Sequence, residues 1–300
     1  MSKDAEILPL WGHYDQLSLK YDPELRALWY FLLPHDRPCF NLDLLGELLS
    51  FQHRLREVNA EAAREGRPLP VRFTIIGSGI PGVFNLGGDL KLFNALIQNQ
   101  DKDGLFGYAK ACIDVLYPNA VNFDMPMTTL SLVQGDALGG GFEAAISSNV
   151  VIAEESAKFG LPEVLFNLVP GMGAYSFLIR RTTPAVAEDL ITSGEVLTAR
   201  KMLDLGLIDQ VVPDGTGRLA ANEQMKAMAK RSNAHAAMGR IRRAVNPITY
   251  EELIHITRIW VDAALQLSPR DMRMIEALVQ AQNRRYNTDP VPLKFKEGMG

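Results

Sequence analysis

Apolar residues in the first two thirds of the chain form short runs separated by longer stretches with helical spacing. The short runs predict buried strands at residues 27–33, 71–76, 127–133 and 150–153. The intervening stretches predict helices from Asn41 or Asp43 to Val58, from about Asp89 to Ile97, and over residues 104–116, 140–147 and 174–181. Strands that alternate with helices are typical of an α/β domain, in which helices cover a sheet.

The pattern changes after about residue 214. Three long helical patterns, at residues 222–243, 251–267 and 269–285, follow one another with no strand between them. The sequence therefore predicts an α/β core over residues 1–214 and an all-helical region over residues 215–300. The apolar faces of this helical region need a partner, which is either the core or another subunit.

Composition and charge narrow the possible functions. The 300 residues are 47% hydrophobic and 22% charged, which is typical of a soluble globular enzyme, and 31 Lys and Arg against 35 Asp and Glu give a net charge of −4. No strong overall field attracts a nucleic acid or an anionic membrane. The first residues carry charges of both signs, and the longest early apolar run, Ala27–Leu33, is far shorter than the roughly 20 residues that span a bilayer. We expect a cytoplasmic protein.

Two kinds of cofactor site are disfavoured by the sequence. Cys39 and Cys112 form no C-x-x-C pair and have no histidine at ligand spacing, so we expect reduced core thiols and no metal site. Residues 77–82 match G-x-G-x-x-G after a predicted strand, but no helix opens there and no second strand ends in an acid about 20 residues later. A nicotinamide site is therefore not expected.

Two glycine-rich segments are candidates for binding an anion or a developing oxyanion. Gly87 and Gly88 precede Asp89 at the start of a predicted helix, and Gly139–Gly141 precede another. N–H groups at a helix start lack intrahelical partners and lie at the positive end of the helix dipole. The alternative for the first segment is an ordinary loop in which Asp89 caps the helix.

Two glutamates are candidates for proton transfer. Glu143 falls in the first turn after the three glycines, where its alternative role is a favourable interaction with the helix dipole. Glu163 is an isolated charge between apolar neighbours, and burial would raise its pKa toward neutrality, unless it simply starts a helix after Pro162. Two donor sites and two carboxylates together indicate an oxyanion hole with an acid/base pair.

The same segments carry a resemblance to a known family. Gly87–Leu90, Ala137–Glu143 and Phe159–Glu163 resemble, in order and spacing, the G-[AG]-D-[LI], A-L-G-G-G-x-E and F-G-x-P-E segments of the crotonase (enoyl-CoA hydratase/isomerase) superfamily. The likeness continues through Pro170–Gly173 and Gly194–Val212 and covers most of residues 25–270.

The resemblance implies both a fold and a site. The expected fold is an α/β spiral of ββα units with a C-terminal all-helical region for oligomerisation, as a homotrimer or a dimer of trimers. The family's oxyanion hole falls on the N–H groups of Gly88 and Gly140, and its acid/base pair on Glu143 and Glu163. No cofactor is expected, because the substrate arrives on the phosphopantetheine of acyl carrier protein or on coenzyme A.

Further segments resemble the branch of the superfamily that makes diffusible signal factors, which are cis-2-unsaturated fatty acids. These segments are Leu28–Tyr30 with Pro38–Phe40, Val83–Leu90, and Pro162–Asn167. Asn85–Leu86 replaces the small pair common in the superfamily, and the usual N-R-P after the first strand is missing. The implied activity is dehydration of a 3-hydroxyacyl-[acyl carrier protein] with thioester hydrolysis. An ordinary enoyl-CoA hydratase/isomerase, or an idle acyl- or protein-binding regulator, remains the alternative.

The resemblance also suggests a substrate pocket and a docking surface. Met172, Trp260 and Leu278 are expected to line an acyl pocket, with ordinary core packing as the alternative. Acyl carrier proteins are acidic, so Arg240, Arg242 and Arg243, with Arg180–Arg181, are the expected docking cluster unless they are solvated helix surface. A regulatory sensor kinase is a further partner that the resemblance leaves open.

Overall fold

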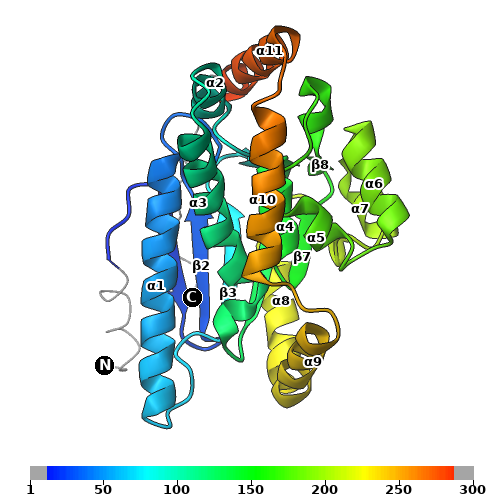
Figure 1. Ribbon diagram of the computed structural model, residues 1–300. Helices are drawn as coiled ribbons and strands as arrows, with labels where there is room; N and C mark the ends of the chain where they lie inside the picture. The colour runs from blue at the N-terminus through cyan, green and yellow to red at the C-terminus, as the bar shows by residue number, and fades with distance from the viewer. Residues whose placement is uncertain (1–11, 287–300) are drawn as a thin grey trace.

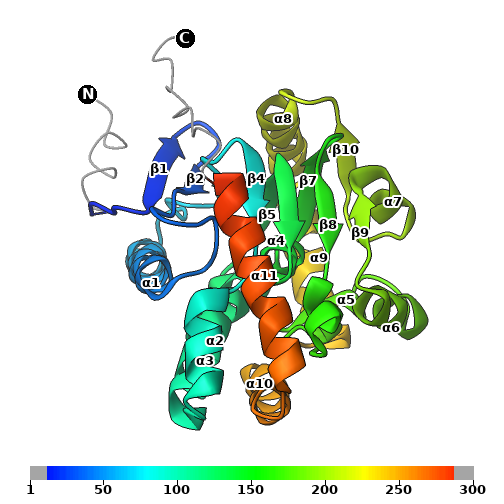
Figure 2. The same ribbon diagram turned by 90° about the horizontal axis from the view of Figure 1, so that it is seen from above.

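The apolar run at Ala27–Leu32 forms a strand, β2, in the computed structural model, which describes residues 12–286 (Figure 1). Every residue of β2 is buried, because side chains of alternate residues meet helices on opposite faces of its sheet. Tyr30 packs against Phe51 of helix α1 (Leu42–Arg64), while Trp29 and Phe31 belong to a core that includes helix α8 (Gly217–Lys230). Figure 2 shows α8 on one side of the sheet and, on the other, α2 (Leu90–Gln98), α3 (Lys102–Ala120) and α10 (Tyr250–Ala264).

The strands form two sheets. The larger is, in spatial order, β1 Leu17–Asp22, β2 Ala27–Leu32, β3 Phe73–Ser78, β5 Thr128–Val133, β7 Val150–Glu154 and β10 Gln210–Val212. The smaller is β4 Gly82–Asn85, β6 Gly135–Leu138, β8 Lys158–Gly160 and β9 Val196–Thr198. Pairing is parallel except between β1 and β2 and between β8 and β9. From β3 onward, each successive pair of strands places one strand in each sheet, whereas β1 and β2 both lie in the larger sheet.

Helices follow and surround these strand pairs. The α-helices are α1 Leu42–Arg64, α2 Leu90–Gln98, α3 Lys102–Ala120, α4 Gly140–Ser147, α5 Ala174–Leu178, α6 Pro184–Ser193, α7 Ala199–Asp204, α8 Gly217–Lys230, α9 Ser232–Val245, α10 Tyr250–Ala264 and α11 Pro269–Tyr286. Short 3₁₀ turns, η3 and η4, lie at Asn122–Asp124 and Pro162–Phe166. The expected class, an α/β spiral of ββα units with a helical C-terminal region, is confirmed.

The helices of the C-terminal region differ in their bounds from those predicted, since the first begins at Gly217 rather than at residue 222. The single helix expected over residues 222–243 is wrong: α8 ends at Lys230 and α9 starts at Ser232, because Arg231 leaves helical geometry with φ −122° and ψ 37°. Helix α8 packs on β5 and β7, and α10 packs on α3, so parts of this region cover the core. A domain boundary at residues 214–215 stays a prediction.

Among the described helices, none is long and apolar enough to cross a bilayer. The first eleven residues, whose mixed charges entered the prediction of location, lie outside the described part of the chain. Cys39 and Cys112 are both buried and are not joined to each other.

Candidate active site

Glu143 and Glu163 are brought together by two neighbouring strands. Glu143 lies in the first turn of α4, directly after β6, and Glu163 lies in η4, shortly after β8. Strands β6 and β8 pair in parallel, so the segments that follow them leave the same edge of the sheet. Both glutamates therefore line one cavity.

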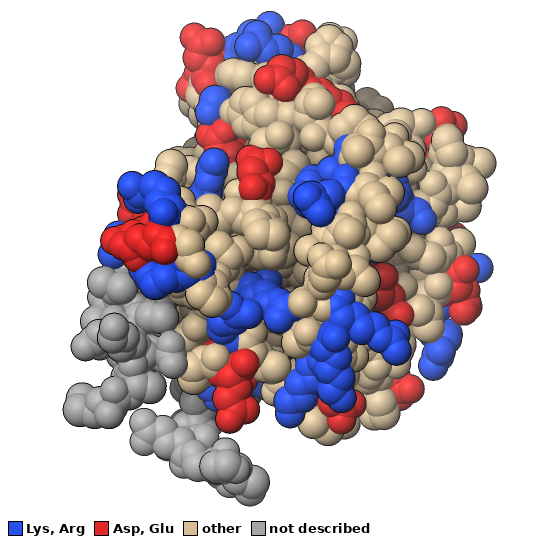
Figure 3. All heavy atoms as spheres, turned by 90° about the horizontal axis from the view of Figure 1, so that it is seen from below, with Lys and Arg blue, Asp and Glu red and all other residues tan. Residues whose placement is uncertain are grey.

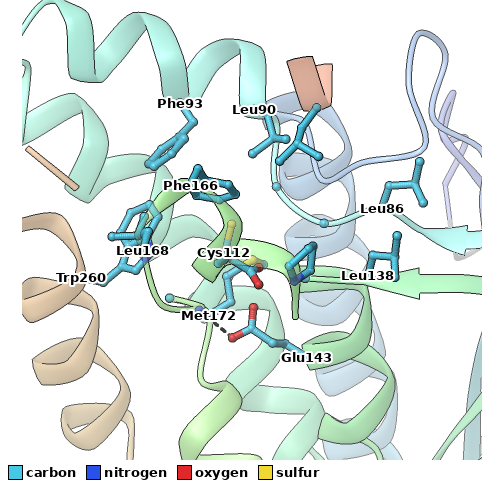
Figure 4. Close-up of a pocket in the computed structure, with 18 of the residues that line it drawn as sticks. Leu86, Leu90, Phe93, Cys112, Leu138, Glu143, Phe166, Leu168, Met172 and Trp260 are labelled. Atoms are coloured by element: carbon cyan, nitrogen blue, oxygen red, sulfur yellow. Dashed lines mark hydrogen bonds between the residues drawn. The ribbon is translucent and has the colours of Figure 1, made fainter. Parts of the chain in front are cut away.

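Glu143 is almost fully enclosed, with 1% of its surface exposed. One of its carboxyl oxygens, Oε1, accepts hydrogen bonds from the N–H groups of Met172 (2.9 Å) and Ala174 (2.7 Å). Burial raises its pKa well above the ordinary range, with a further contribution from the charge of Glu163, and the two hydrogen bonds oppose this rise. Figure 4 shows the second carboxyl oxygen away from these bonds, where it can face a ligand.

Glu163 differs from Glu143 in the hydrogen bonding of its carboxyl group. Its Oε2 is buried and has no hydrogen-bond partner in the described part of the chain. Burial raises its pKa above the ordinary value of a glutamate. An unpaired buried carboxyl oxygen beside a second acid is suited to taking a proton from a bound molecule.

The free energy of unfolding of Glu163→Gln should increase relative to that of the wild type as the pH rises. The unfolded glutamate has its ordinary pKa of 4.5, whereas burial raises the folded value to about 7. Below pH 4.5 both states hold the proton, and between these values only the folded state does, so the free energy of unfolding of the wild type falls as pH rises toward 7. The loss is about 1.4 kcal/mol for each unit of raised pKa.

Urea unfolding of wild type and Glu163→Gln at pH 4.5 and pH 8 measures this difference. The variant should gain stability relative to wild type between the two conditions. A difference that is the same at both pH values would show that Glu163 ionises in the folded protein as easily as in water.

Four successive N–H groups at the end of β4 show which backbone donor is left for a ligand. The Leu86 N–H donates to the Pro38 carbonyl (2.7 Å) and the Gly87 N–H to Oδ1 of Asn85 (2.8 Å). The Asp89 N–H donates to the hydroxyl of Tyr108 (2.7 Å). Within the described residues no acceptor is found for the Gly88 N–H between them.

The second candidate donor, the N–H of Gly140, lies close to Gly87, the residue that precedes Gly88. Gly140 is the first residue of α4, so its N–H has no carbonyl one turn earlier to pair with. A Cβ on Gly87, whose φ is +97°, would lie only 3.1 Å from the Gly140 nitrogen. Gly88 and Gly140 both line the cavity that holds the two glutamates. This arrangement can bind one oxyanion with two N–H groups.

The cavity has a volume of about 320 Å³ and is mostly apolar. Met172, Trp260 and Leu278, expected from the sequence to line an acyl pocket, all face it. Figure 4 shows Glu143 and Met172 between an aromatic group, which includes Trp260, and Leu138. Trp260 stacks on another member of this group, Phe93, with ring centroids 5.2 Å apart. The cavity therefore combines two acids and two backbone donors with walls that suit an alkyl chain.

Sequence reasoning missed several residues of this cavity. Phe93, Tyr108, Phe166 and Leu168 also line it. Their sequence positions carried no signal that separates a pocket wall from a core. Helix α11 packs against α2 and η4 and brings Leu278 to the cavity, a contact between segments far apart in the sequence.

The expected docking arginines do not join this site. Arg240, Arg242 and Arg243 lie on α9, which meets the Tyr250 end of α10, whereas Trp260 lies near the other end (Figure 1). Figure 3, seen from the α9 side, shows basic side chains gathered in several groups on this face. Docking by these three arginines stays a prediction.

The neighbouring pair, Arg180 and Arg181, is engaged inside the protein, with side chains only 17% and 14% exposed. Arg180 pairs with both carboxyl oxygens of Glu252, at 2.9 and 2.7 Å. Arg181 donates to backbone carbonyls of Ile146, Leu207 and Ser148. These bonds already use the guanidinium groups that a carrier protein would need.

The G-x-G-x-x-G match ends in a strand rather than a helix. Gly77 lies within β3, Gly79 follows that strand, and Gly82 begins β4. No helix N-terminus is present there to hold a pyrophosphate, in agreement with the sequence reasoning. In the described part of the chain, no group of three or more His, Cys, Asp or Glu side chains could hold a metal ion.

Residues 65–271 match the sequence profile of the enoyl-CoA hydratase/isomerase family. The chain belongs to this family. It is 34% identical over 135 residues to a probable enoyl-CoA hydratase of Bacillus subtilis. The aligned residues make up 45% of the chain and 50% of that relative. It thus spans about half the length of this relative. It is also 28% identical over 223 residues to carnitinyl-CoA dehydratase of Salmonella heidelberg, which covers 74% of the chain and 81% of the relative.

Solved structures share the fold of this enoyl-CoA hydratase/isomerase family member. An enoyl-CoA hydratase from Bacillus halodurans superposes with a TM-score of 0.74 at 20% identity, over 88% of the chain and 100% of that structure. DspI of Pseudomonas aeruginosa superposes with a TM-score of 0.66 at 20% identity, over 89% of the chain and 97% of that structure.

Proposed function

We propose that this protein dehydrates a 3-hydroxyacyl-[acyl carrier protein] thioester to its cis-2-enoyl form and then hydrolyses the thioester, which releases a fatty acid signal. One observation carries the proposal: two buried carboxyl groups share an apolar cavity that Gly88 and Gly140, the two candidate N–H donors, also line. A binding protein has no need of a paired acid and base. An acyl thioester presents the three groups that this cavity complements, namely an oxygen, an acidic α-proton and an alkyl chain.

Dehydration uses each group once. Glu163 takes the α-proton, and the electrons of that C–H bond form an enolate whose oxygen accepts hydrogen bonds from Gly88 and Gly140. The enolate then expels the 3-hydroxyl group, which leaves as water after Glu143 protonates it. Because Oε1 of Glu143 is an acceptor for Met172 and Ala174, the transferable proton resides on the other oxygen, toward the cavity.

Hydrolysis uses the same donors. Water, deprotonated by one glutamate, adds to the thioester carbonyl, and the tetrahedral oxyanion occupies the place of the enolate oxygen. Collapse of this intermediate breaks the C–S bond, the thiolate receives a proton, and the free acid leaves. The resemblance of Val83–Leu90 and Pro162–Asn167 to the signal-synthase branch supports this second step.

Acyl release from carrier-protein and coenzyme A thioesters, measured side by side, tests the proposal. The purified protein is given the same 3-hydroxydodecanoyl group on each carrier, and free acid is quantified by mass spectrometry. Free unsaturated acid, formed faster from the carrier-protein thioester, is expected. Hydration and dehydration of the coenzyme A thioester without any free acid would instead assign the alternative, an ordinary enoyl-CoA hydratase/isomerase.

The helical region supports a further part of the proposal, assembly as a homotrimer or a dimer of trimers. Helix α9 has no buried residue in the single chain, and its Met238, Ile241 and Val245 are 53%, 52% and 79% exposed. Apolar side chains exposed along one helix are typical of a surface that a partner covers.

Trp260→Leu should shift the preference toward longer acyl chains. The indole lies over Gly171, where a Cβ would come within 2.5 Å of the ring, and a smaller side chain opens space at this wall. Each additional buried methylene is worth about 0.8 kcal/mol, or roughly fourfold in kcat/KM. Chain-length profiles over a series of 3-hydroxyacyl thioesters measure this effect.

Trp29→Leu is the control, because Trp29 also carries an indole but packs against Phe31 in the core on the other face of the large sheet. It should lower stability and leave the profile unchanged. An unchanged profile in Trp260→Leu, together with lower stability, would show that Trp260 is ordinary core.

A further inference from the structure

Tyr108 occupies an unusual place between two segments that approach each other at the cavity. It lies on α3 and is 6% exposed. Its hydroxyl donates to the Phe40 carbonyl (2.8 Å) and accepts from the Asp89 N–H (2.7 Å). In this way one phenol oxygen joins the chain before α1 to the residue that directly follows Gly88.

The peptide bonds on both sides of Gly88 are fixed by different partners. The Phe40 N–H donates to the Gly87 carbonyl (2.8 Å). Because C=O and N–H point in opposite directions in a trans peptide, this bond turns the Gly88 N–H away from Phe40. The next peptide, which joins Gly88 to Asp89, is held by the Tyr108 hydroxyl.

Gly88 needs this support because neither it nor Gly87 has a side chain that could anchor the loop. A Cβ on Gly88 would lie 3.1 Å from the Tyr108 oxygen, so the phenol also packs directly against the glycine. Asp89 is fixed in turn, since its Oδ1 accepts from Arg37 Nη2 (2.8 Å). The loop is thus rigid on one side of Gly88 through Asn85 and Phe40, and on the other through Tyr108.

We propose that Tyr108 is a positioning residue that holds the Gly88 N–H in the direction required to polarise a thioester carbonyl. It acts through the Gly88–Asp89 peptide and does not itself contact the reacting oxygen. The inference rests on the proposed function only in assuming that Gly88 binds a thioester oxygen. It adds a residue from α3, a helix that supplies neither glutamate nor donor.

Tyr108→Phe removes one oxygen atom and tests the inference. Loss of a whole oxyanion donor lowers kcat by about 10² to 10³-fold, so misdirection of one donor should lower kcat by roughly 10 to 10²-fold, with KM changed by less than about threefold. Tyr21→Phe is the matched control, because it removes the hydrogen bond from a buried tyrosine hydroxyl to the Pro70 carbonyl (2.7 Å) far from the cavity. It should leave kcat unchanged.

Infrared spectroscopy separates positioning from a general structural role. The probe is dodecanoyl-N-acetylcysteamine with an isotope-labelled carbonyl, bound to Glu163→Gln protein so that it is not turned over. Its carbonyl band should shift to lower frequency on binding, and adding Tyr108→Phe should remove much of this shift, whereas adding Tyr21→Phe should not. If Tyr108→Phe does not fold, a monofluorinated tyrosine at position 108 keeps the hydroxyl but weakens it as an acceptor, and it should reduce the shift partway.

The outcomes distinguish this inference from the proposed function. A full carbonyl shift in Tyr108→Phe or the fluorinated protein overturns the inference and leaves the dehydratase proposal standing. A Tyr108-dependent shift without any dehydration of 3-hydroxyacyl thioesters supports the inference and overturns the proposed reaction. No shift in the Glu163→Gln protein with Tyr108 intact overturns the role of Gly88, and the inference with it.

Discussion

Glu143→Gln and Glu163→Gln should each lower kcat for dehydration by about 10² to 10⁴-fold, the usual contribution of a general acid or base. An amide has the shape of a carboxyl group but cannot exchange the proton. At position 143 an amide oxygen can still accept from the Met172 and Ala174 N–H groups, so the turn that follows Pro170 should keep its conformation. Initial rates with a 3-hydroxyacyl thioester, with thermal unfolding of each variant, measure the effect.

Glu154→Gln is a matched control for both variants. Glu154 is also a buried glutamate, 5% exposed, but its Oε1 accepts from Gln134 Nε2 (2.7 Å) and the Gly217 N–H (3.0 Å), away from the cavity. This substitution should change stability and leave kcat nearly intact. Turnover close to wild type in Glu143→Gln or Glu163→Gln would remove that residue from the mechanism.

Gly141→Ala should damage both the site and the fold. A Cβ at this position would lie 2.0 Å from the carbonyl oxygen of Asn85, a backbone atom that cannot move independently of β4. Relief of this clash separates α4 from the segment that carries Gly88, and a misplacement of about 1 Å can lower kcat by roughly 10²-fold. Overpacking of this kind typically costs about 1–3 kcal/mol of stability.

Gly46→Ala provides the comparison for Gly141→Ala. Gly46 lies within α1, and a Cβ there meets nothing within 4 Å. Alanine should therefore stabilise the helix by about 0.5–1 kcal/mol and leave kcat unchanged. If Gly141→Ala behaved like Gly46→Ala in urea unfolding and steady-state assays, close packing of α4 on β4 would not be required for the site.

The residues that the structure brings together in the candidate site could be singled out from the sequence because they break local patterns. Gly139–Gly141 are an unusual run before a helix, and Glu163 is a charge among apolar residues. The reason for the glycines was only partly foreseen. Ligand access was expected, but Gly139 has φ +51° and Gly141 meets the backbone of β4.

The strands of the smaller sheet could not be predicted from local pattern. Gly82–Asn85, Gly135–Leu138 and Lys158–Gly160 have three or four residues each, and each contains glycine. Such segments are too short to show the alternation of apolar and polar residues that marks a strand. They form because β4, β6 and β8 each follow a longer strand of the large sheet. Pairing between distant segments, rather than intrinsic preference, decides them.

Tyr108 and the break at Arg231 were hidden for related reasons. A tyrosine on the apolar side of a helix looks like core until its hydroxyl is seen between Phe40 and Asp89. The helical pattern through Arg231 is continuous in sequence, but α8 packs on the sheet while α9 buries none of its residues. Tertiary packing overrides helix propensity at Arg231, whereas at Tyr108 it gives a residue of the predicted helix a hydrogen-bonding role that the local pattern does not show.

Product analysis of a single reaction tests the central claim most directly. Purified wild-type protein is incubated with 3-hydroxydodecanoyl-[acyl carrier protein] in heavy-oxygen water, and the products are separated by gas chromatography and identified by mass spectrometry. The account predicts free cis-2-dodecenoic acid with heavy oxygen in its carboxyl group, formed by wild type and not by Glu143→Gln or Glu163→Gln. Unchanged substrate, or saturated 3-hydroxy acid released without loss of water, would contradict it.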